Sequence, residues 1–243
     1  MKHLLILFLL LALPWSLAAQ IGEHRNTLSV GPTAGWNITN IKFTPKVEQK
    51  GLGGFSGGVA LRYTVEKYFS TICSIQLEMN YAQMGWKEDI KDINDNPVIN
   101  ATTGVAENYS RTINYIQVPF LAHLAWGKEK KGLNFFVNAG PQLGVCLSES
   151  TKSNFDFDKR NMADRVSSVV AQDTMKVEHK FDYGIAAGLG VEYTIPRVGH
   201  FLLEGRYYYG LGNIYGDTKR DYFASSNYQT ISIRLTYLFD LKH

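Results

Sequence analysis

The feature that most constrains this chain is an alternation of apolar and polar residues, repeated in about eight stretches. Successive residues of a β-strand face opposite sides, so each stretch has one apolar face and one polar face. The alternation is clearest near the C-terminus, where one face carries Ile231, Ile233, Leu235, Tyr237 and Phe239 and the other carries Thr230, Ser232, Arg234 and Thr236. We expect strands at about 27–38, 54–67, 70–86, 110–126, 133–149, 179–195, 200–214 and 227–241. Only the fourth is blurred, because Tyr115, Pro119 and Leu121 fall on its polar face.

The connections between these stretches run long, short, long, short to the end of the chain. Outer-membrane barrels have short periplasmic turns and long external loops, and an even number of strands puts both termini in the periplasm. We therefore expect 39–53, 87–109, 150–178 and 215–226 to face outside. A soluble eight-stranded barrel such as a lipocalin would instead keep its apolar face inside, around a ligand cavity. Here glycines and charged residues lie on the same face of each strand, which suits a narrow polar interior. The sequence therefore favours an all-β fold, an eight-stranded antiparallel up-and-down transmembrane β-barrel.

The first residues predict export. Lys2 precedes an apolar run at 4–13, and a small-x-small pattern follows at 16–18; this is typical of a secretory signal peptide. We therefore expect a signal peptide at 1–19 and an outer-membrane β-barrel domain at 20–243. The apolar run is shorter than the roughly 20 residues that a spanning helix needs. Insertion in the outer membrane would thus be by strands.

The charge balance argues against a nucleic-acid partner. The formal net charge is +3, and the only dense basic run is at 128–131, in an expected turn. The expected partners are outer-membrane lipid and an envelope protein bound through the external loops.

The polar faces of the expected strands also carry charged residues of both signs, near the middle of the barrel. They are Arg62, Glu78, Glu192, Glu204, Arg206 and Arg234. The interior of an eight-stranded barrel is just wide enough for side chains to fill it, and an unpaired charge in such a space is costly. We therefore expect these residues to form a structural charge network that plugs the lumen.

Catalytic and metal-binding motifs do not stand out. Hydrolysis requires a nucleophile within reach of a histidine base, and the histidines beyond the signal segment are His24, His123, His179, His200 and His243. Ser148, Ser150 and His179 could meet near the outer rim. His123 is expected to be a structural residue of the lumen. No enzyme is predicted. The expected external loops contain several acidic residues, which are either solvated surface charges or weak Ca²⁺ ligands. They are Glu88, Asp89, Asp92, Asp95, Asp156, Asp158, Asp164 and Asp173. We expect no cofactor and no metal.

The two cysteines are expected to be free thiols. Cys73 lies at the periplasmic start of the third strand, whereas Cys146 lies well up the fifth. A disulfide tolerates Cα atoms no more than about 7 Å apart.

Six segments carry a resemblance to a known family. They are Gly54–Tyr63, Leu77–Gly85, Tyr115–Phe120, Phe136–Gly144, Phe181–Tyr193 and Tyr207–Ile214. In order and spacing the chain resembles the PorT-type outer-membrane β-barrel family of Bacteroidetes, over nearly its whole length after the signal segment. The resemblance implies an eight-stranded outer-membrane barrel. The namesake of the family is an accessory component of the type IX secretion and gliding machinery, but most members have no assigned activity, and no signature here selects the namesake's branch.

The expected function is a structural or interaction role in the cell envelope, with the external loops as the binding surface. Three alternatives remain open on the sequence: an accessory subunit of a secretion or uptake complex, a small-solute pore, and, least favoured, an outer-membrane lipid hydrolase.

Overall fold

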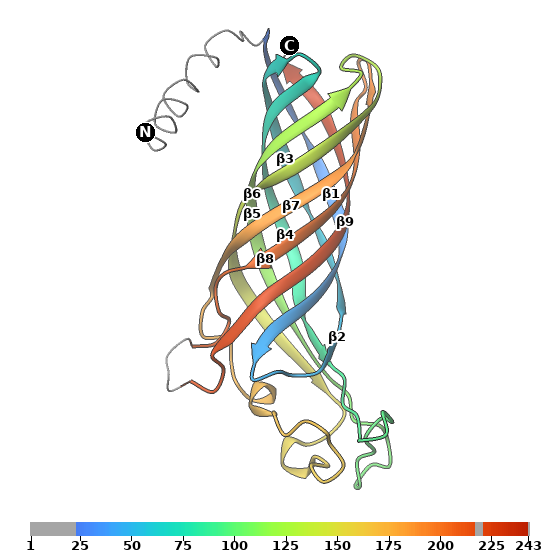
Figure 1. The fold of residues 1–243 in the computed structure, drawn as a ribbon, viewed down its shortest axis with the longest axis vertical. Coiled ribbons are helices and arrows are strands. Elements are labelled where there is room, and N and C mark those ends of the chain that lie inside the picture. Colours follow the sequence, from blue (N-terminus) through green and yellow to red (C-terminus); the bar gives the residue numbers. More distant parts are fainter. Residues whose placement is uncertain (1–22, 217–220, 243) are drawn as a thin grey trace, which may run out of the picture.

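The alternating stretches form eight long strands that close into a barrel (Figure 1). The structure is a computed structural model that describes residues 23–216 and 221–242. The predicted signal peptide at 1–19 lies outside the described residues. The strands are β1 (Glu23–Thr44), β3 (Leu52–Tyr68), β4 (Thr71–Glu88), β5 (Tyr109–Gly127), β6 (Gly132–Ser153), β7 (Phe181–Ile195), β8 (Gly199–Gly210) and β9 (Ser225–Lys242), and a short β2 (Gln49–Lys50) adds to β4.

Each long strand pairs antiparallel with its neighbour in sequence, and β9 returns to pair with β1. The eight strands therefore leave no unpaired edge among themselves. Closure matters because hydrocarbon offers no hydrogen-bond partner to an open edge. The predicted fold class, an eight-stranded antiparallel up-and-down transmembrane β-barrel, is confirmed.

The apolar face of the wall points outward. Leu189, Ile233 and Phe135 are 69%, 64% and 63% exposed, while Thr236 and Ser232 on the other parity are buried. A lipocalin-like barrel would show the reverse, so the soluble alternative is wrong. Within residues 23–216 and 221–242, no helix has the length and apolarity to cross a membrane.

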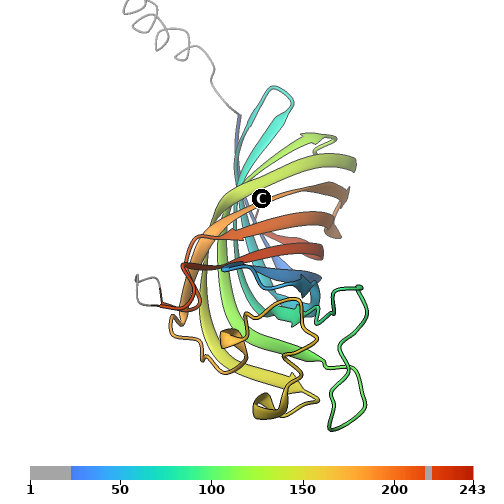
Figure 2. The same cartoon turned by 60° about the horizontal axis from the view of Figure 1, so that its bottom comes forward.

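The two ends of the barrel differ, as the connection lengths predicted. The turns at 69–70, 128–131 and 196–198 gather at the end where the described chain reaches its C-terminus, at the top of Figure 1. The opposite, external end carries loop 1 (45–51), loop 2 (89–108), loop 3 (154–180) and loop 4 (211–224, of which 217–220 are not described). Seen from that end, loops 2 and 3 project beyond the rim (Figure 2). Loop 1 is shorter than expected because β1 and β3 extend to Thr44 and Leu52.

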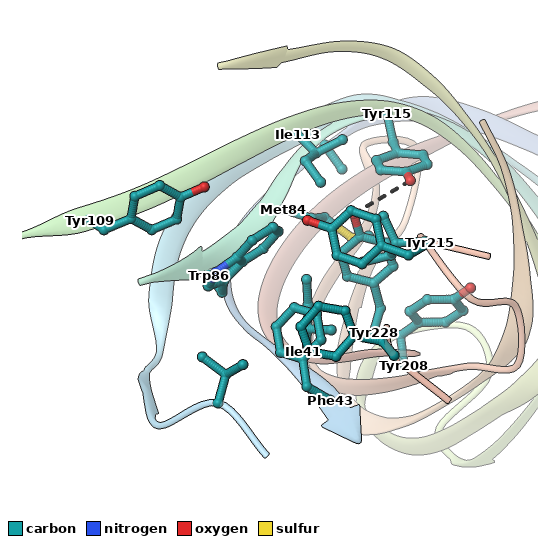
Figure 3. Packing of buried hydrophobic residues seen from close by; sticks show 14 of the residues in the cluster. Ile41, Phe43, Met84, Trp86, Tyr109, Ile113, Tyr115, Tyr208, Tyr215 and Tyr228 are labelled. Atoms are coloured by element: carbon teal, nitrogen blue, oxygen red, sulfur yellow. Dashed lines mark hydrogen bonds between the residues drawn. The ribbon is translucent and has the colours of Figure 1, made fainter. Parts of the chain in front are cut away.

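The interior is not polar throughout. A cluster of buried aromatic and aliphatic side chains fills its external end (Figure 3). Tyr115 and Tyr228 meet edge to face there, with ring centroids 5.6 Å apart. This explains the blurred fourth stretch: Tyr115 and Leu121 do occupy the lumen-facing parity of β5, and both are fully buried.

Both cysteines are free. Cys73 lies on β4 and Cys146 on β6, with β5 between those two strands.

Candidate functional site

Four of the six predicted network residues form one cluster at mid-barrel, which we call the charge belt: Glu78, Glu204, Arg206 and Arg234. Arg206 Nη2 lies 2.7 Å from Glu78 Oε1, and Arg206 Nε lies 2.8 Å from Glu204 Oε1. Arg234 Nη2 approaches Glu78 Oε2 at 3.3 Å. Each side chain of the belt is at most 4% exposed. The belt therefore fills the centre of the lumen with opposite charges that neutralise one another.

The pairing within the belt crosses the lumen as well as following the wall. Register places Glu204 of β8 opposite Arg234 of β9, but the guanidinium of Arg206 on β8 reaches Glu78 on β4, in the facing wall. A barrel of eight strands is narrow enough for one long side chain to span it. Neighbouring-strand charge patterns alone did not predict these partners.

The other two predicted residues form a separate cluster nearer the periplasm. Arg62 donates to both oxygens of Glu192, at 2.6 and 3.1 Å. His200 Nδ1 lies 2.7 Å and His123 Nε2 3.5 Å from the same carboxylate. His200 Nε2 also faces Asp240, at 3.2 Å. We call these five residues the Glu192 cluster.

Sequence reasoning missed part of the Glu192 cluster. The position of His123 on the polar face of its strand predicts a lumen residue, but it does not predict the contact with Glu192. His200 begins a strand and Asp240 nearly ends one, where alternation no longer distinguishes lumen from solvent. Only the closed barrel brings these two strand ends together, since β8 pairs with β9.

Between the Glu192 cluster and the periplasmic end of the barrel lies a cavity of about 770 Å³, which we call the vestibule. All eight long strands contribute to its wall, together with the turns at 128–131 and 196–198. Much of the wall is hydroxyl and amide, from Thr27, Ser29, Thr64, Ser74 and Asn134. Lys130 and Arg197 lie at its mouth and are exposed.

Loop 3 closes the external end. Its residues 171–175, which we call the plug segment, include the short 3₁₀ helix η4 (Ala171–Asp173). Gln172 and Asp173 are 0% and 1% exposed, although they belong to a loop. Arg111 of β5 donates to the carbonyl of Asp173 at 3.1 Å, and Gln172 Nε2 donates to Glu88 at 2.6 Å. The plug segment thus lies inside the mouth of the barrel.

Arg160 pairs with the Asp173 carboxylate at 2.9 Å. Burial nevertheless raises the pKa of Asp173 above its ordinary value. Burial penalises the charged form of a carboxyl group.

Loops 2 and 3 are tied to each other through Glu107. Its carboxylate accepts from Arg165 at 2.6 Å, from the Asn161 amide at 2.8 Å and from Asn100 at 2.8 Å. Burial alone would raise the pKa of Glu107, but these three hydrogen bonds hold the pKa below its ordinary value. A further backbone bond runs from the Val166 amide to the Lys91 carbonyl, at 3.1 Å.

Between the two tied loops runs a groove of about 610 Å³, which we call the cap groove. Its apolar wall includes Ile93, Ile99 and Val166, which are 89%, 49% and 65% exposed. Asp92, Asp164 and Arg165 add charges along it. The groove lies on the external loops and combines apolar and charged side chains.

Several of the acidic loop residues considered as weak Ca²⁺ ligands have protein partners. Lys50 and Lys91 pair with Asp89, at 2.7 and 3.2 Å. Asp92 accepts from the backbone amides of Asn94 and Asn96. Within the described ranges no group of three or more potential metal ligands occurs.

The candidate catalytic residues form hydrogen bonds with other groups. His179 Nδ1 lies 3.1 Å from the Asn213 carbonyl, and Ser148 accepts from Asn114 at 2.9 Å. In the vestibule Ser29 donates to Asp240, and His200 bonds to the same carboxylate. Because the acid lies between serine and histidine, this histidine cannot take the serine's proton as a base. His24 is exposed, and His243 lies outside the described residues.

A family-level comparison agrees with this architecture. A family model described as "Outer membrane protein beta-barrel domain" matches residues 18–216. Among solved structures, the chain is similar to Ail of Yersinia pestis, with 11% identity over 89% of this chain and 99% of that chain and a TM-score of 0.33. It is also similar to OprG of Pseudomonas aeruginosa, with 11% identity over 90% and 98% of the two chains and a TM-score of 0.42. No curated protein matches the chain.

Proposed function

The chain belongs to the outer membrane protein beta-barrel domain family and lies in the outer membrane, and we propose that it acts there as a non-catalytic interaction component. Its binding surface is the cap groove between loops 2 and 3. Its outward apolar wall contacts outer-membrane lipid, and no nucleic acid is a partner.

The observation that carries this proposal is the construction of the cap groove. Ile93 and Val166 come from different loops, and the Glu107 contacts hold those loops in one arrangement. A surface that is already ordered avoids much of the entropy loss on binding. Apolar side chains gathered in an exposed groove are typical of protein interaction sites. The groove therefore supports binding of an envelope protein with an apolar segment.

The pore alternative is less well supported. A conducting path would have to pass the plug segment, the aromatic cluster and the charge belt, each of which is packed with buried side chains. An accessory role in a secretion or uptake complex remains compatible with the proposal, because it would use the same cap groove. The histidine contacts described above support a role other than lipid hydrolysis.

Within the family, we propose membership of the PorT-type branch of Bacteroidetes. The support is the order and spacing of the six segments from Gly54–Tyr63 to Tyr207–Ile214.

Site-specific photo-crosslinking in intact cells tests the cap groove. A photoreactive side chain replaces Ile93 in one variant and Val166 in a second, and Lys46 of loop 1, which is also exposed, serves as the control position. We expect the first two variants to form a crosslink to the same envelope protein and the control to form none. The substitution V166D should then remove the crosslink formed at position 93. Equal crosslinking at all three positions, or none at either groove position, would contradict the proposal.

A further inference from the structure

The vestibule contains buried polar atoms without a partner. Among the described residues, Arg62 Nε and Asn134 Oδ1 have no hydrogen-bond partner. Both residues line the vestibule, and they are 3% and 2% exposed. A buried donor or acceptor left unpaired costs roughly 1–3 kcal/mol. These two atoms are covered by the surrounding protein, but their side chains form part of the polar wall of the vestibule.

The acidic groups of the vestibule each contact a basic side chain of the protein. Arg62 and His200 contact Glu192, Arg25 and Lys67 contact Glu129, the latter at 3.2 Å, and His200 contacts Asp240. Two cations at the mouth differ in this respect. Lys130 and Arg197 form no ion pair with any residue that the structure describes.

The vestibule is therefore suited to an anion. Its uncompensated charge is positive and lies at the mouth, where it would attract anions from the periplasm. Its volume of about 770 Å³ is in the range of small-molecule sites, about 300–1,000 Å³. Its hydroxyl-rich wall favours a polar molecule over an acyl chain, and the Glu192 cluster closes its inner side.

We propose that the vestibule is a binding site for a small hydrophilic anion of the periplasm that carries a carboxylate or phosphate. Lys130 and Arg197 hold the acidic group, and the polar body of the ligand contacts the hydroxyl groups of the wall, such as those of Thr64 and Ser74. The site is separate from the cap groove, since the two lie at opposite ends of the barrel. Either proposal can therefore fail without the other.

Calorimetric titration of the complete barrel in phosphatidylcholine nanodiscs tests this site. The probes are citrate, glucose 6-phosphate and, as an uncharged control, glucose. We expect the two anions to bind and glucose to bind at least about tenfold more weakly, because only the anions use the cations at the mouth. Glucose binding as strongly as glucose 6-phosphate would overturn the proposal.

Matched variants separate a built site from general charge. The double variant K130Q/R197Q should weaken anion binding about tenfold. The control K128Q/K131Q removes the same number of charges at the same end of the barrel, but neither of its residues lines the vestibule. An equal loss in both double variants would overturn the proposal. N134D, which places a negative charge on the vestibule wall, should weaken binding further, and gel migration before and after boiling checks that it folds.

The source of the anion is distinguished by lipid composition. Replacing part of the phosphatidylcholine with phosphatidylglycerol provides a competing phosphate headgroup. Competition that disappears in K130Q/R197Q identifies a lipid headgroup as the occupant, whereas unchanged citrate affinity identifies a soluble anion. Competition of equal size in K128Q/K131Q and K130Q/R197Q would place the headgroup outside the vestibule and contradict the proposal.

Discussion

Glu78 shows how a charge is accommodated inside this barrel. Its carboxylate accepts hydrogen bonds from Arg206, Arg234, Gln76 and Asn80, and the side chain has no exposed surface. A buried carboxylate is tolerated only when donors replace the water that it has lost. The belt therefore depends on these contacts, and removing one member leaves its partners charged and buried.

Replacing Arg206 tests this dependence. R206A removes the hydrogen bonds to both Glu78 and Glu204 and should lower the free energy of unfolding by about 3–5 kcal/mol. R234A should have a smaller effect, because Arg234 makes one contact of 3.3 Å with Glu78 while Arg206 makes two shorter ones. Urea unfolding in lipid vesicles measures both, with the exposed Lys131→Ala as control. A loss below about 1 kcal/mol for R206A would indicate a hydrated lumen instead.

Glu107 makes the external cap sensitive to acid. Its pKa is lowered in the folded protein, so its contribution to stability is present above the unfolded carboxyl pKa of about 4.3 and is lost as the pH falls through the lower folded value. We expect hydrogen exchange in loops 2 and 3 to accelerate as the pH falls below about 4.3, after correction for intrinsic exchange.

The variant E107Q should loosen the same loops already at neutral pH and remove this pH dependence. E178Q, at an exposed loop position, is the control and should behave as the wild type. An E107Q variant with wild-type exchange at neutral pH would show that the Arg165 pair does not hold the loops together.

At the scale of elements, β9 closes the barrel. It pairs along nearly its whole length with β1 and with β8. Its sequence has the most regular alternation, and that regularity fits a strand with lipid on one face and the packed lumen on the other.

Deleting 228–243 should therefore prevent assembly. The deletion leaves β1 and β8 with unpaired edges, which a bilayer does not tolerate. We expect the truncated chain to lose the heat-modifiable gel migration of a closed barrel and to be extracted from membranes by urea. Deletion of the exposed tip of loop 2 at 101–104 is the control and should preserve both properties. Correct insertion of the truncated chain would show that β9 is dispensable for closure.

Alternation predicted the strands because a spanning strand must separate a lipid face from a lumen face at every residue. It could not predict what fills the lumen. Tyr115 and Leu121 interrupt the alternation on β5, because they are apolar residues on its lumen-facing side. Both pack inside a lumen that is partly apolar. The partners of Arg62 and Arg206 lie on facing strands, and the burial of Gln172 depends on how loop 3 folds. Such contacts arise from closure of the barrel, which the spacing along the chain does not encode.

At the scale of the whole molecule, the barrel is asymmetric. Its external end is closed by loop 3 and the aromatic cluster, its centre by the charge belt, and its periplasmic end holds the vestibule. Three barriers, the plug segment of loop 3, the aromatic cluster and the charge belt, therefore lie in series between the outside and the periplasm. An interaction at the cap groove and a ligand in the vestibule can coexist without a continuous path for solutes.

This arrangement makes a definite prediction for planar bilayers. The complete protein should show no conductance steps, because an ion would have to displace the plug segment, the aromatic cluster and the belt. Deleting 171–175 alone should still give no conductance steps, because Arg206 and Glu78 continue to fill the centre of the lumen. Combining that deletion with R206S and R234S, and with Y115A and Y228A in the aromatic cluster, opens all three barriers, and only this variant should conduct, provided that boiled and unboiled samples still migrate differently on a gel. Steps from the complete protein, or from the plug deletion alone, would show that the belt is permeable and would restore the pore as the better account of function.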